Sequence, residues 1–478
     1  MTETTGMATM AGKRTQASIR HSLLSVVIVG YVASVAGWAS AALARTPPTP
    51  TRPPTIAPTA ADALAPPAAP ISDLAPTVDA VMASIRAQYG VAGIAVGVTI
   101  DGRHHFFNYG QASRESKRPV SRRTLFEIGS ASKTFAAAVA AEARARGLFR
   151  WQDTVSNVVP TLRGSAFDEI RMWQLGTHSA GLPMNLPDGV GDEAHLLAYL
   201  QHWTPPQERG PANAAAGLQR RYSNVGIGVL GWAAAQRVGR PYADIMQADM
   251  LPALGMRDTF LTVSRNRMLD YAQGYTRDDR PIRLHPDLLA DEAYGVKSSA
   301  ADLVRYLDLQ IEAGRLPDTQ TRGTAPAEAE TKVPVPVSVT APSRRAAWLA
   351  AFAATQRPWL QAGTITQDLM WEQYVYPVSL AALQAGNGNG AALKTLPATL
   401  LTRKGKGANV PDASDAAASP IVWINKTGST NGFGTYLVFI PQRRIGVVML
   451  FNKNVPIEAR VAAAARIVSV IDPSGLRP

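Results

Sequence analysis

One segment of the chain holds a serine and a lysine at a spacing that can support nucleophilic catalysis. Residues 126–135 read FEIGSASKTF and contain the only S-x-x-K of the chain, at Ser130 and Lys133. An alanine-rich run over 136–146 follows and stops at Gly147, which predicts a helix with Ser130 at or near its N-terminus. On a helix the two side chains share a face, where the ammonium group and the free N–H groups of the helix end can activate the hydroxyl. The alternative for so short a motif is an N-cap serine followed by a solvated lysine.

Two further motifs stand downstream of this segment. Tyr222, Ser223 and Asn224 form a Y-x-N, and residues 426–428 form the only K-T-G of the chain, at the end of a predicted strand. Each motif alone is ordinary, because a tyrosine usually packs in a core and K-T-G can be a turn. Together, in the order S-x-x-K, Y-x-N and K-T-G, they match a set of serine acyl-transferases that includes β-lactamases and penicillin-binding proteins.

The chain resembles the class C (AmpC-type) serine β-lactamases of the penicillin-binding/transpeptidase-like superfamily. Tyrosine stands in the middle motif where other members carry S-D-N, and longer stretches agree with the family: 126–135, 180–183 (AGLP), 292–298 (EAYGVKS), 370–374 (MWEQY) and 426–436 (KTGSTNGFGTY). The resemblance spans roughly residues 75–472. It implies hydrolysis of penicillins and cephalosporins through a serine acyl-enzyme, and hence antibiotic resistance.

Three other functions are compatible with the same fold. A D-Ala-D-Ala carboxypeptidase or a serine esterase would use the same nucleophile, although such enzymes often depart from the Y-x-N or K-T-G pattern. A β-lactam-binding sensor would acylate and not turn over, and nothing in the motif set excludes it.

The resemblance also implies catalytic roles. Ser130 would be the nucleophile, and Tyr222 would be the general base, held as or near phenolate by Lys133 and Lys426. A phenol with a pKa near 10 works near neutral pH only if adjacent cations lower that pKa, and two lysines are a plausible source. The backbone N–H groups of Ser130 and Ser429 would form the oxyanion hole.

Seven residues are implied to bind substrate, namely Asn185, Asn224, Tyr294, Thr427, Gly428, Ser429 and Arg460. Asn224 would hydrogen-bond the acylamino side chain of the substrate, with Asn185 and Tyr294 lining the same pocket. Thr427 would face the substrate carboxylate beside Lys426, and Gly428 would leave room for the edge strand to approach. One position departs from the family: Ile457 stands where an asparagine is usual, three residues before Arg460, which leaves the substrate preference open.

The N-terminal part of the chain predicts export. Lys13, Arg14 and Arg20 precede an apolar segment over 22–38, and two cleavage sites of the A-x-A kind follow, ending at Ala44 and, as second choice, at Ala41. We interpret residues 1–44 as a signal peptide and expect a periplasmic protein, with an uncleaved anchor as the alternative. Residues 45–70 are rich in Pro, Thr and Ala and are expected to form a linker.

The remaining residues, 71–478, are expected to form one α/β (α+β) domain. Residues 78–89 predict a helix, and 92–109 predict a β-hairpin with an Asp-Gly turn. Three strands, at 421–425, 433–440 and 445–451, and a helix over 456–471 end the chain. We therefore expect an antiparallel sheet built from both chain ends and flanked by helices, with a mainly helical region packed against it and the catalytic groove between the two. Low-complexity insertions are expected near 315–345 and 385–420.

Composition excludes several other classes of site. The chain has no cysteine, which removes disulfides, thiolate nucleophiles and Cys-ligated metals. Its 7 histidines form no zinc motif, so no metal and no cofactor are expected. The G-x-G-x-x-G over 226–231 follows no clear strand and is better explained by close helix packing than by dinucleotide binding. The net charge of +12 comes without basic blocks interleaved with aromatic residues, so no nucleic acid is expected. We further expect a small-molecule substrate, a monomer, and no stable membrane partner after signal cleavage.

Overall fold

The computed structural model describes residues 71–205, 217–316, 343–388, 393–401 and 420–477. The expected signal peptide (1–44) and linker (45–70) lie outside the described residues, as do most of the two expected insertions. Among the described residues, no helix has both the length and the apolar character needed to cross a membrane.

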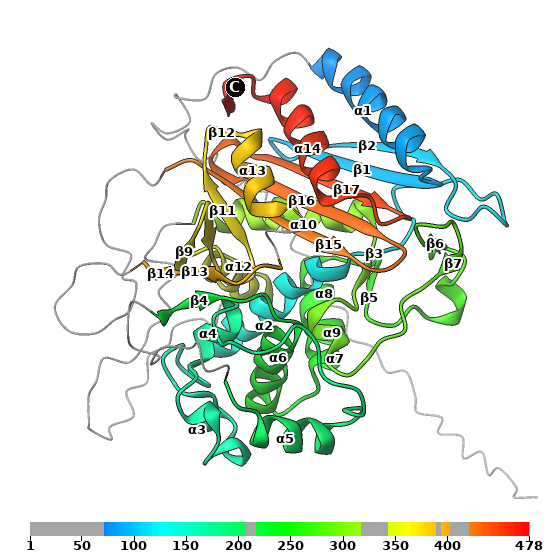
Figure 1. The fold of residues 1–478 in the computed structure, drawn as a ribbon. Coiled ribbons are helices and arrows are strands. Elements are labelled where there is room, and N and C mark those ends of the chain that lie inside the picture. The colour runs from blue at the N-terminus through cyan, green and yellow to red at the C-terminus, as the bar shows by residue number, and fades with distance from the viewer. Residues whose placement is uncertain (1–70, 206–216, 317–342, 389–392, 402–419, 478) are drawn as a thin grey trace, which may run out of the picture. The chain divides into compact units, whose positions relative to one another are not determined.

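A nine-stranded antiparallel sheet runs through the molecule (Figure 1). Its order is β14-β9-β10-β11-β15-β16-β17-β1-β2. The strands are β1 (Gly93–Ile100), β2 (Arg103–Gly110), β9 (Leu360–Ala362), β10 (Ile365–Gln367), β11 (Glu372–Val375), β14 (Thr399–Leu400), β15 (Val422–Ser429), β16 (Gly434–Ile440) and β17 (Ile445–Phe451). Because β1 pairs with β17, segments from both ends of the described chain lie side by side in one sheet, as the sequence predicts.

The hairpin that carries β1 and β2 turns through two residues. Asp101 and Gly102 have φ values of 53° and 76°, and Ile100 pairs with Arg103 across the turn. Positive φ at both central residues matches the twist of the flanking strands, and Asp-Gly tolerates it at low cost. The expected hairpin is therefore confirmed.

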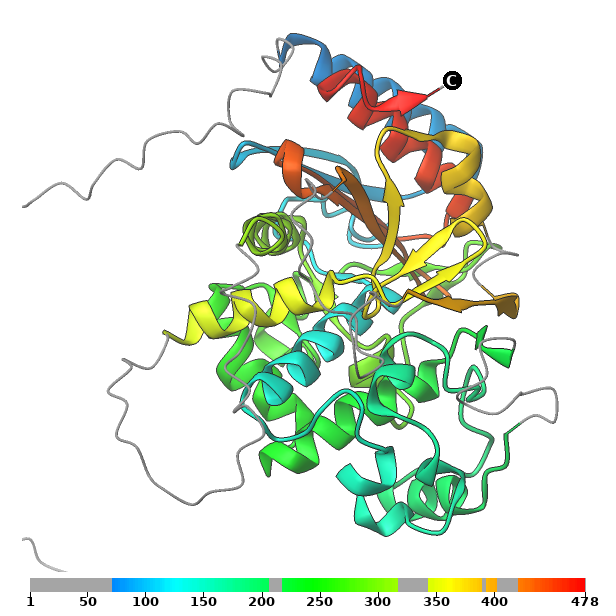
Figure 2. The same ribbon diagram turned by 90° about the vertical axis from the view of Figure 1, so that its left-hand side faces the viewer.

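Both faces of the central strands are covered by helices (Figure 2). On one face lie α1 (Leu74–Tyr89), α13 (Leu380–Asn387) and α14 (Ile457–Ile471), and on the other lies α10 (Ala300–Ala313). Successive side chains of a strand point to opposite faces, and in β17 Val447 and Met449 pack with the first layer while Val448 and Leu450 pack with the second. This double burial explains why β16 and β17 are almost continuously apolar.

The helical region is built around α2 (Lys133–Ala145), whose alanines let other helices approach closely. α6 (Asn224–Val238) packs beside α2, and α12 (Arg344–Thr355) also contacts α2. The shorter helices are α3 (Val155–Val158), α4 (Met172–Gly176), α5 (Glu193–His202), α7 (Tyr242–Asp244), α8 (Leu251–Leu254) and α9 (Ala290–Ala293). Further short strands pair in separate two- and three-stranded sheets: β3 (Phe126–Glu127), β4 (Gln219–Arg220), β5 (Thr259–Phe260), β6 (Gly274–Tyr275), β7 (Pro281–Ile282), β8 (Lys297–Ser298), β12 (Val378–Ser379), β13 (Leu396–Pro397) and β18 (Leu476–Arg477).

The glycine pattern over 226–231 serves helix packing. A Cβ atom at Gly228 would lie 2.7 Å from the Leu289 side chain, and one at Gly231 would lie 2.6 Å from the Glu292 side chain. These two glycines let α6 lie close to the segment that contains α9, which agrees with the packing interpretation of the motif.

The structure assigns some residues of both expected insertions to helices and strands, so the insertions are shorter than expected. Residues 385–387 complete α13, with Gly386 and Asn387 buried, and residues 396–400 supply β13 and β14. Ser343 caps α12 by accepting a hydrogen bond from the N–H of Ala346, so the last residues of 315–345 belong to a helix end. The strands β9, β10 and β11 were not expected, because each has only three or four residues and little alternation of apolar and polar side chains.

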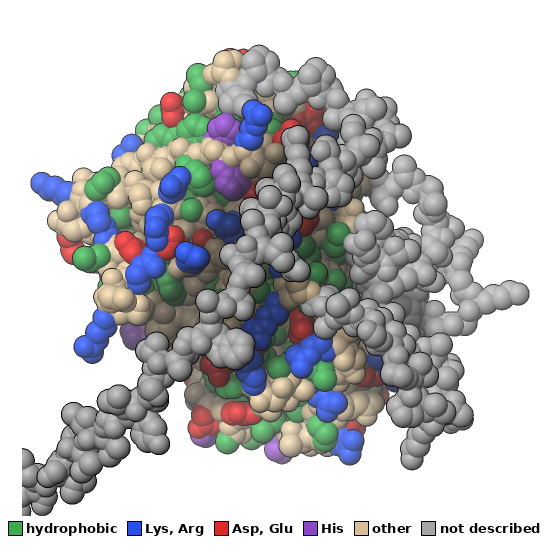
Figure 3. All heavy atoms as spheres, turned by 180° about the vertical axis from the view of Figure 1, so that it is seen from behind, with side chains coloured by type: hydrophobic (Ala, Val, Ile, Leu, Met, Phe, Trp, Pro, Cys, Tyr) green, Lys and Arg blue, Asp and Glu red, His purple; other side chains and the backbone are tan. Residues whose placement is uncertain are grey.

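Basic and acidic side chains are mixed on one face of the molecule. Figure 3 shows Lys and Arg side chains distributed among acidic ones on one face of the molecule. Several arginines of the basic loop 113–123 are paired: Arg114 with Asp279 and Arg123 with Asp258, each at 3.0 Å. The excess positive charge is therefore partly offset locally.

One carboxyl group is buried without compensation. Asp368 lies between β10 and β11 with no exposed surface, and neither of its carboxyl oxygens has a hydrogen-bond partner among the described residues. Burial raises the pKa of this carboxyl well above its ordinary value, so the folded protein holds it protonated where the unfolded chain would ionise it. Folding thus becomes less favourable as the pH rises above about 4.

We expect Asp368→Asn to increase the free energy of unfolding at pH 8, by about 1.4 kcal/mol for each pH unit above about 4 over which the folded protein holds Asp368 protonated. The amide keeps the shape and cannot ionise, so the gain should shrink towards zero near pH 4. Urea unfolding at pH 4, 6 and 8 measures it. A gain that is the same at all three pH values would contradict the explanation.

Candidate active site

The S-x-x-K serine lies on a tight turn directly before α2. A 3₁₀ turn, Gly129–Ser132, leads into α2 at Lys133, so Ser130 stands at the helix entrance as the sequence predicts. Gly129 has a φ of 51°, and a Cβ there would lie 2.5 Å from the backbone nitrogen of Ser429. A Cβ at Gly428 would lie 1.9 Å from the carbonyl oxygen of Ile128. Glycine at both positions therefore allows the end of β15 to contact the serine turn.

The position of β15 corrects one expectation. It was expected at the edge of the sheet, but it lies between β11 and β16. β11 pairs only with residues 422–425 of β15, whereas β16 pairs with residues 424–429. The K-T-G residues therefore belong to an interior strand whose last four residues have no strand partner on the β11 side.

Lys133 is buried and contacts the serine hydroxyl. Its Nζ lies 3.0 Å from Ser130 Oγ and donates a hydrogen bond of 2.7 Å to the carbonyl of Ala293. Burial lowers the pKa of Lys133 to about 8, and the positive charge of Lys426 acts in the same direction, while Tyr222 opposes both. A lysine of this kind exchanges its proton near neutral pH.

Tyr222 lies within a group of cations. The Nζ atoms of Lys133 and Lys426 lie 5.1 and 5.3 Å from its ring centroid, and Arg220 lies on the same ring at 5.8 Å. Burial is the largest single influence on the Tyr222 pKa and raises it. The charges of the two lysines and a hydrogen bond with Ser130 outweigh burial and lower the pKa to about 8. The sequence-based expectation of a phenol acidified by two lysines agrees with this arrangement.

Two residues of this group were not found from the sequence. His178 stacks on Tyr222 with ring centroids 4.1 Å apart, and its Nδ1 accepts a hydrogen bond from the N–H of Ser223. Burial and the surrounding cations hold the pKa of His178 well below its ordinary value, so the ring is neutral. Arg220 is fully buried and donates to Glu372 at 3.0 Å and to Gln367 at 2.7 Å. One signal in the sequence pointed to Arg220, its position two residues before Tyr222. The acceptors of Arg220 come from β10 and β11, far along the chain.

Arg460, which is implied to bind substrate, has a side chain with no exposed surface. Its guanidinium donates to the carbonyls of Gly428 and Thr435 and to the hydroxyl of Ser429 at 2.8 Å. Arg460 therefore holds the end of β15, and any influence on a ligand passes through Ser429. Ile457 packs against the apolar layer around α1 and α14.

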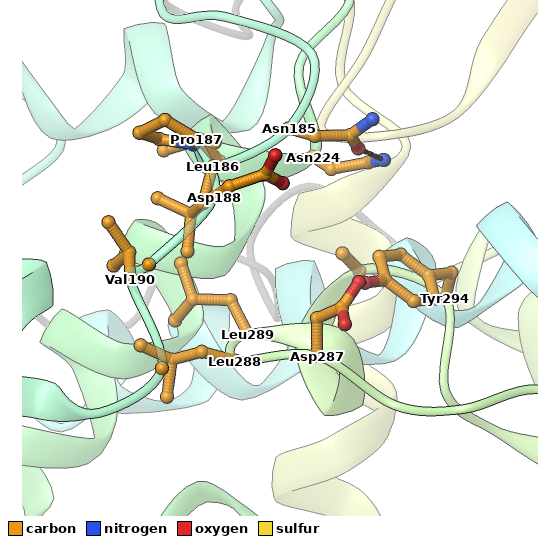
Figure 4. Close-up of a pocket in the computed structure, with 14 residues that line it drawn as sticks. Asn185, Leu186, Pro187, Asp188, Val190, Asn224, Asp287, Leu288, Leu289 and Tyr294 are labelled. Carbon is orange, nitrogen blue, oxygen red and sulfur yellow. Dashed lines mark hydrogen bonds between the residues drawn. The ribbon is translucent and has the colours of Figure 1, made fainter. Parts of the chain in front are cut away.

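A cavity of about 340 Å³ adjoins this cluster (Figure 4). Asn185, Asn224 and Tyr294 all line it, as expected from the sequence. Asn224 donates to Asn185 at 2.7 Å, and the Asn224 carbonyl oxygen is buried without a partner among the described residues. Ala293 connects the cavity to the serine, because it lines the cavity while its carbonyl accepts from Lys133.

The residues of the three motifs thus meet at one place. The acceptor, cation and hydroxyl that acyl transfer needs are adjacent, and the cavity beside them can accommodate a side chain of the acyl group. No group of three or more His, Asp or Glu side chains within the described ranges is arranged to hold a metal ion.

Comparisons with known proteins agree with this geometry. The model of the β-lactamase family matches residues 78–471. A β-lactamase of Pseudomonas fluorescens is 36% identical over 403 residues, which is 84% of this chain and 99% of the relative. A class C β-lactamase solved with cefoxitin is 38% identical with a TM-score of 0.69, covering 83% of this chain and 99% of that one. The D-alanine carboxypeptidase AmpC of Burkholderia cenocepacia is also 38% identical, with a TM-score of 0.68 and coverage of 84% and 99%.

The expected fold, a β-lactamase/transpeptidase-like arrangement with a sheet built from both chain ends, is confirmed by these structures. With the family model covering most of the chain and relatives matched over nearly their whole length, the chain belongs to the β-lactamase family and is of the class C, AmpC-type, serine kind.

Proposed function

We propose that this protein hydrolyses β-lactams through an acyl-enzyme formed on Ser130. The observation that carries the proposal is the contact of 3.0 Å between Lys133 and Ser130, beside a tyrosine whose pKa is lowered to about 8. This arrangement supplies a nucleophile and a base that can act near neutral pH.

In acylation, Tyr222 as phenolate takes the proton of the Ser130 hydroxyl. The oxygen attacks the lactam carbonyl, the C–N bond of the ring breaks, and the ring nitrogen takes the proton that Tyr222 received, which restores the phenolate. The N–H groups of Ser130 and Ser429 would stabilise the negative oxygen of the tetrahedral intermediate. Contact between the serine turn and the end of β15 supports this role for Ser429.

Substrate would lie along the end of β15, with its carboxylate at Lys426 and Thr427. The acylamino group would meet Asn224, whose carbonyl oxygen has no partner in the described residues and can accept an amide N–H. Asn185 and Tyr294 line the same cavity. Arg460 would hold Gly428 and Ser429 in place through its hydrogen bonds to them.

In deacylation, a water molecule that gives its proton to Tyr222 would release the product. A D-alanine carboxypeptidase would use the same steps with D-alanine as leaving group, and two structural neighbours carry that name in their descriptions. A sensor would stop at the acyl-enzyme. The rate of the last step therefore separates these functions.

The organisation of the chain fits a periplasmic enzyme. Residues 1–44 would be removed after export, and residues 45–70 would link to the domain that begins near Ile71. The proposed reaction calls for a monomer without cofactor, nucleic acid or stable membrane partner.

The decisive experiment is hydrolysis of a chromogenic cephalosporin by the mature protein. We expect steady turnover that continues after the first equivalent of product. A burst of one equivalent followed by no turnover would indicate a sensor, and turnover of D-Ala-D-Ala peptides with no lactam hydrolysis would indicate a peptidase.

Ser130→Ala should abolish both penicillin labelling and hydrolysis, because no other group is placed to carry the acyl chain. Intact-protein mass spectrometry after incubation with benzylpenicillin measures the label. Ser132→Ala is the matched control, since Ser132 is fully buried and directs its hydroxyl to the Gly129 carbonyl; its folded protein should still be labelled at Ser130. An adduct on the Ser130→Ala protein with retained activity would refute the assignment.

Acylation should depend on pH through the Tyr222–Lys133 pair. Because the phenolate is the active form, kcat/KM should rise as the pH increases towards about 8 and then level. Lys426→Gln removes one cation that lowers the Tyr222 pKa, so the rising limb should move to higher pH. Stopped-flow acylation from pH 6 to 10 measures the limb.

Tyr222→Phe should lower kcat/KM by about 10²–10⁴-fold, the usual contribution of a general base. Circular dichroism should show an unchanged fold. A loss under about threefold would instead point to Lys133 as the base.

A further inference from the structure

The cavity beside the proposed catalytic cluster carries an uncompensated negative charge. Asp188 and Asp287 both line it, and among the fourteen described residues of its wall none is Lys, Arg or His. This contrasts with a chain whose net charge is +12. The side of the cavity away from the lysines therefore attracts cations.

The two carboxylates come from different segments and project into the same space. Figure 4 shows Asp188 on the loop that also carries Asn185, and Asp287 on the segment before α9, with both side chains directed into the space between these segments. Asp287 accepts a hydrogen bond of 3.2 Å from the Tyr294 hydroxyl through one oxygen. Asp188 makes no hydrogen bond or ion pair with any described residue, so it is free to contact a ligand.

The cavity and the serine cluster carry charges of opposite sign: the cavity is negative and the cluster is positive. Lys133 and Lys426 lie on the Tyr222 ring, with Lys133 also at Ser130, whereas the aspartates lie in the cavity that begins at Asn224 and Ala293. A zwitterionic ligand matches both ends: its carboxylate would face Lys426, and a cationic group on its acyl side chain would face the aspartates. The rest of the wall is largely apolar, from leucines, two valines and a proline, and suits the hydrocarbon part of that side chain.

We propose that this cavity selects acyl side chains that bear an ammonium group, so that zwitterionic β-lactams are the preferred substrates. The inference rests on the proposed hydrolysis at Ser130 and specifies its substrate class. Asp188 and Asp287 act as specificity-determining residues through charge, with Asn224 and Asn185 holding the amide that precedes the ammonium-bearing carbon.

Two penicillins that differ in one group provide the test. The phenylglycyl compound, ampicillin, carries an α-ammonium group, and the phenylacetyl compound, benzylpenicillin, does not. The measured quantity is the ratio of their kcat/KM values, so that any general loss of activity in a variant cancels. We expect the ratio to favour ampicillin in the natural protein and to fall by roughly threefold to tenfold in Asp188→Asn/Asp287→Asn, the range for exposed charge pairs.

Asp278→Asn is the matched control. Asp278 is an exposed aspartate outside the cavity wall, paired at 3.8 Å with Arg280, and its substitution makes the same change of charge as each of the two substitutions in the double variant. The ratio should stay as in the natural protein. Raising the pH above the pKa of the substrate amine, about 8, should abolish the preference in the natural protein, and high salt should weaken it.

Each outcome decides between the two claims. Hydrolysis of both penicillins with a ratio that neither the double variant nor pH changes would overturn the charge selection and leave the hydrolysis at Ser130 standing. Failure to acylate with either penicillin would overturn the proposed function and this inference together. A ratio that falls equally in Asp278→Asn would show a long-range charge effect, and would also overturn the role given to the cavity.

Discussion

The structure depends on the burial of the Lys133 ammonium group without a carboxylate partner. Within the described chain its Nζ contacts a hydroxyl and a carbonyl, and Lys426 lies on the same tyrosine ring without an acid of its own. Two buried cations in a medium of low polarity are costly unless a negative charge forms beside them. The phenolate of Tyr222 is the group that can supply it. The cost of burying two unpaired cations, which would only destabilise a core without a reactive group, here favours the deprotonated form of Tyr222.

Two features of the fold keep the buried lysines beside Tyr222. Backbone segments are held in close contact, and the other groups near the ring add no uncompensated charge. Gly129 and Gly428 let the serine turn contact β15, and Arg460 holds the end of this strand through two acceptors on β15 and one on β16. Arg220, the remaining cation near the ring, has its charge compensated by Glu372 of β11, which leaves the two lysines to act on the phenol. His178 contributes a neutral ring and adds no further positive charge.

The sequence predicted those parts that short-range patterns encode. The motif residues, the Asp-Gly hairpin and the three C-terminal strands follow from local spacing and alternation, and the structure has them with small shifts of boundary. The parts it did not predict depend on contacts between distant segments. The partners of Arg220 lie about 150 residues downstream, on strands too short to show a period. The buried state of Arg460 depends on carbonyls of β15 and β16, and the unpaired Asp368 has no signature in its neighbours along the chain.

The pairing of β1 with β17 has a consequence for biosynthesis. The N–H of Gly93 binds the side chain of Asn452 at a separation of 359 residues, and the sheet between them cannot form until β17 has been made. Contacts of such long range are slow to form, and a growing chain that lacks its last strands exposes the edges of a partial sheet. During synthesis the domain would therefore remain unfolded until nearly its whole length is available. A polypeptide with this topology is suited to passage through a narrow channel in an extended, unfolded state, because its sheet cannot be completed before the C-terminal strands are made.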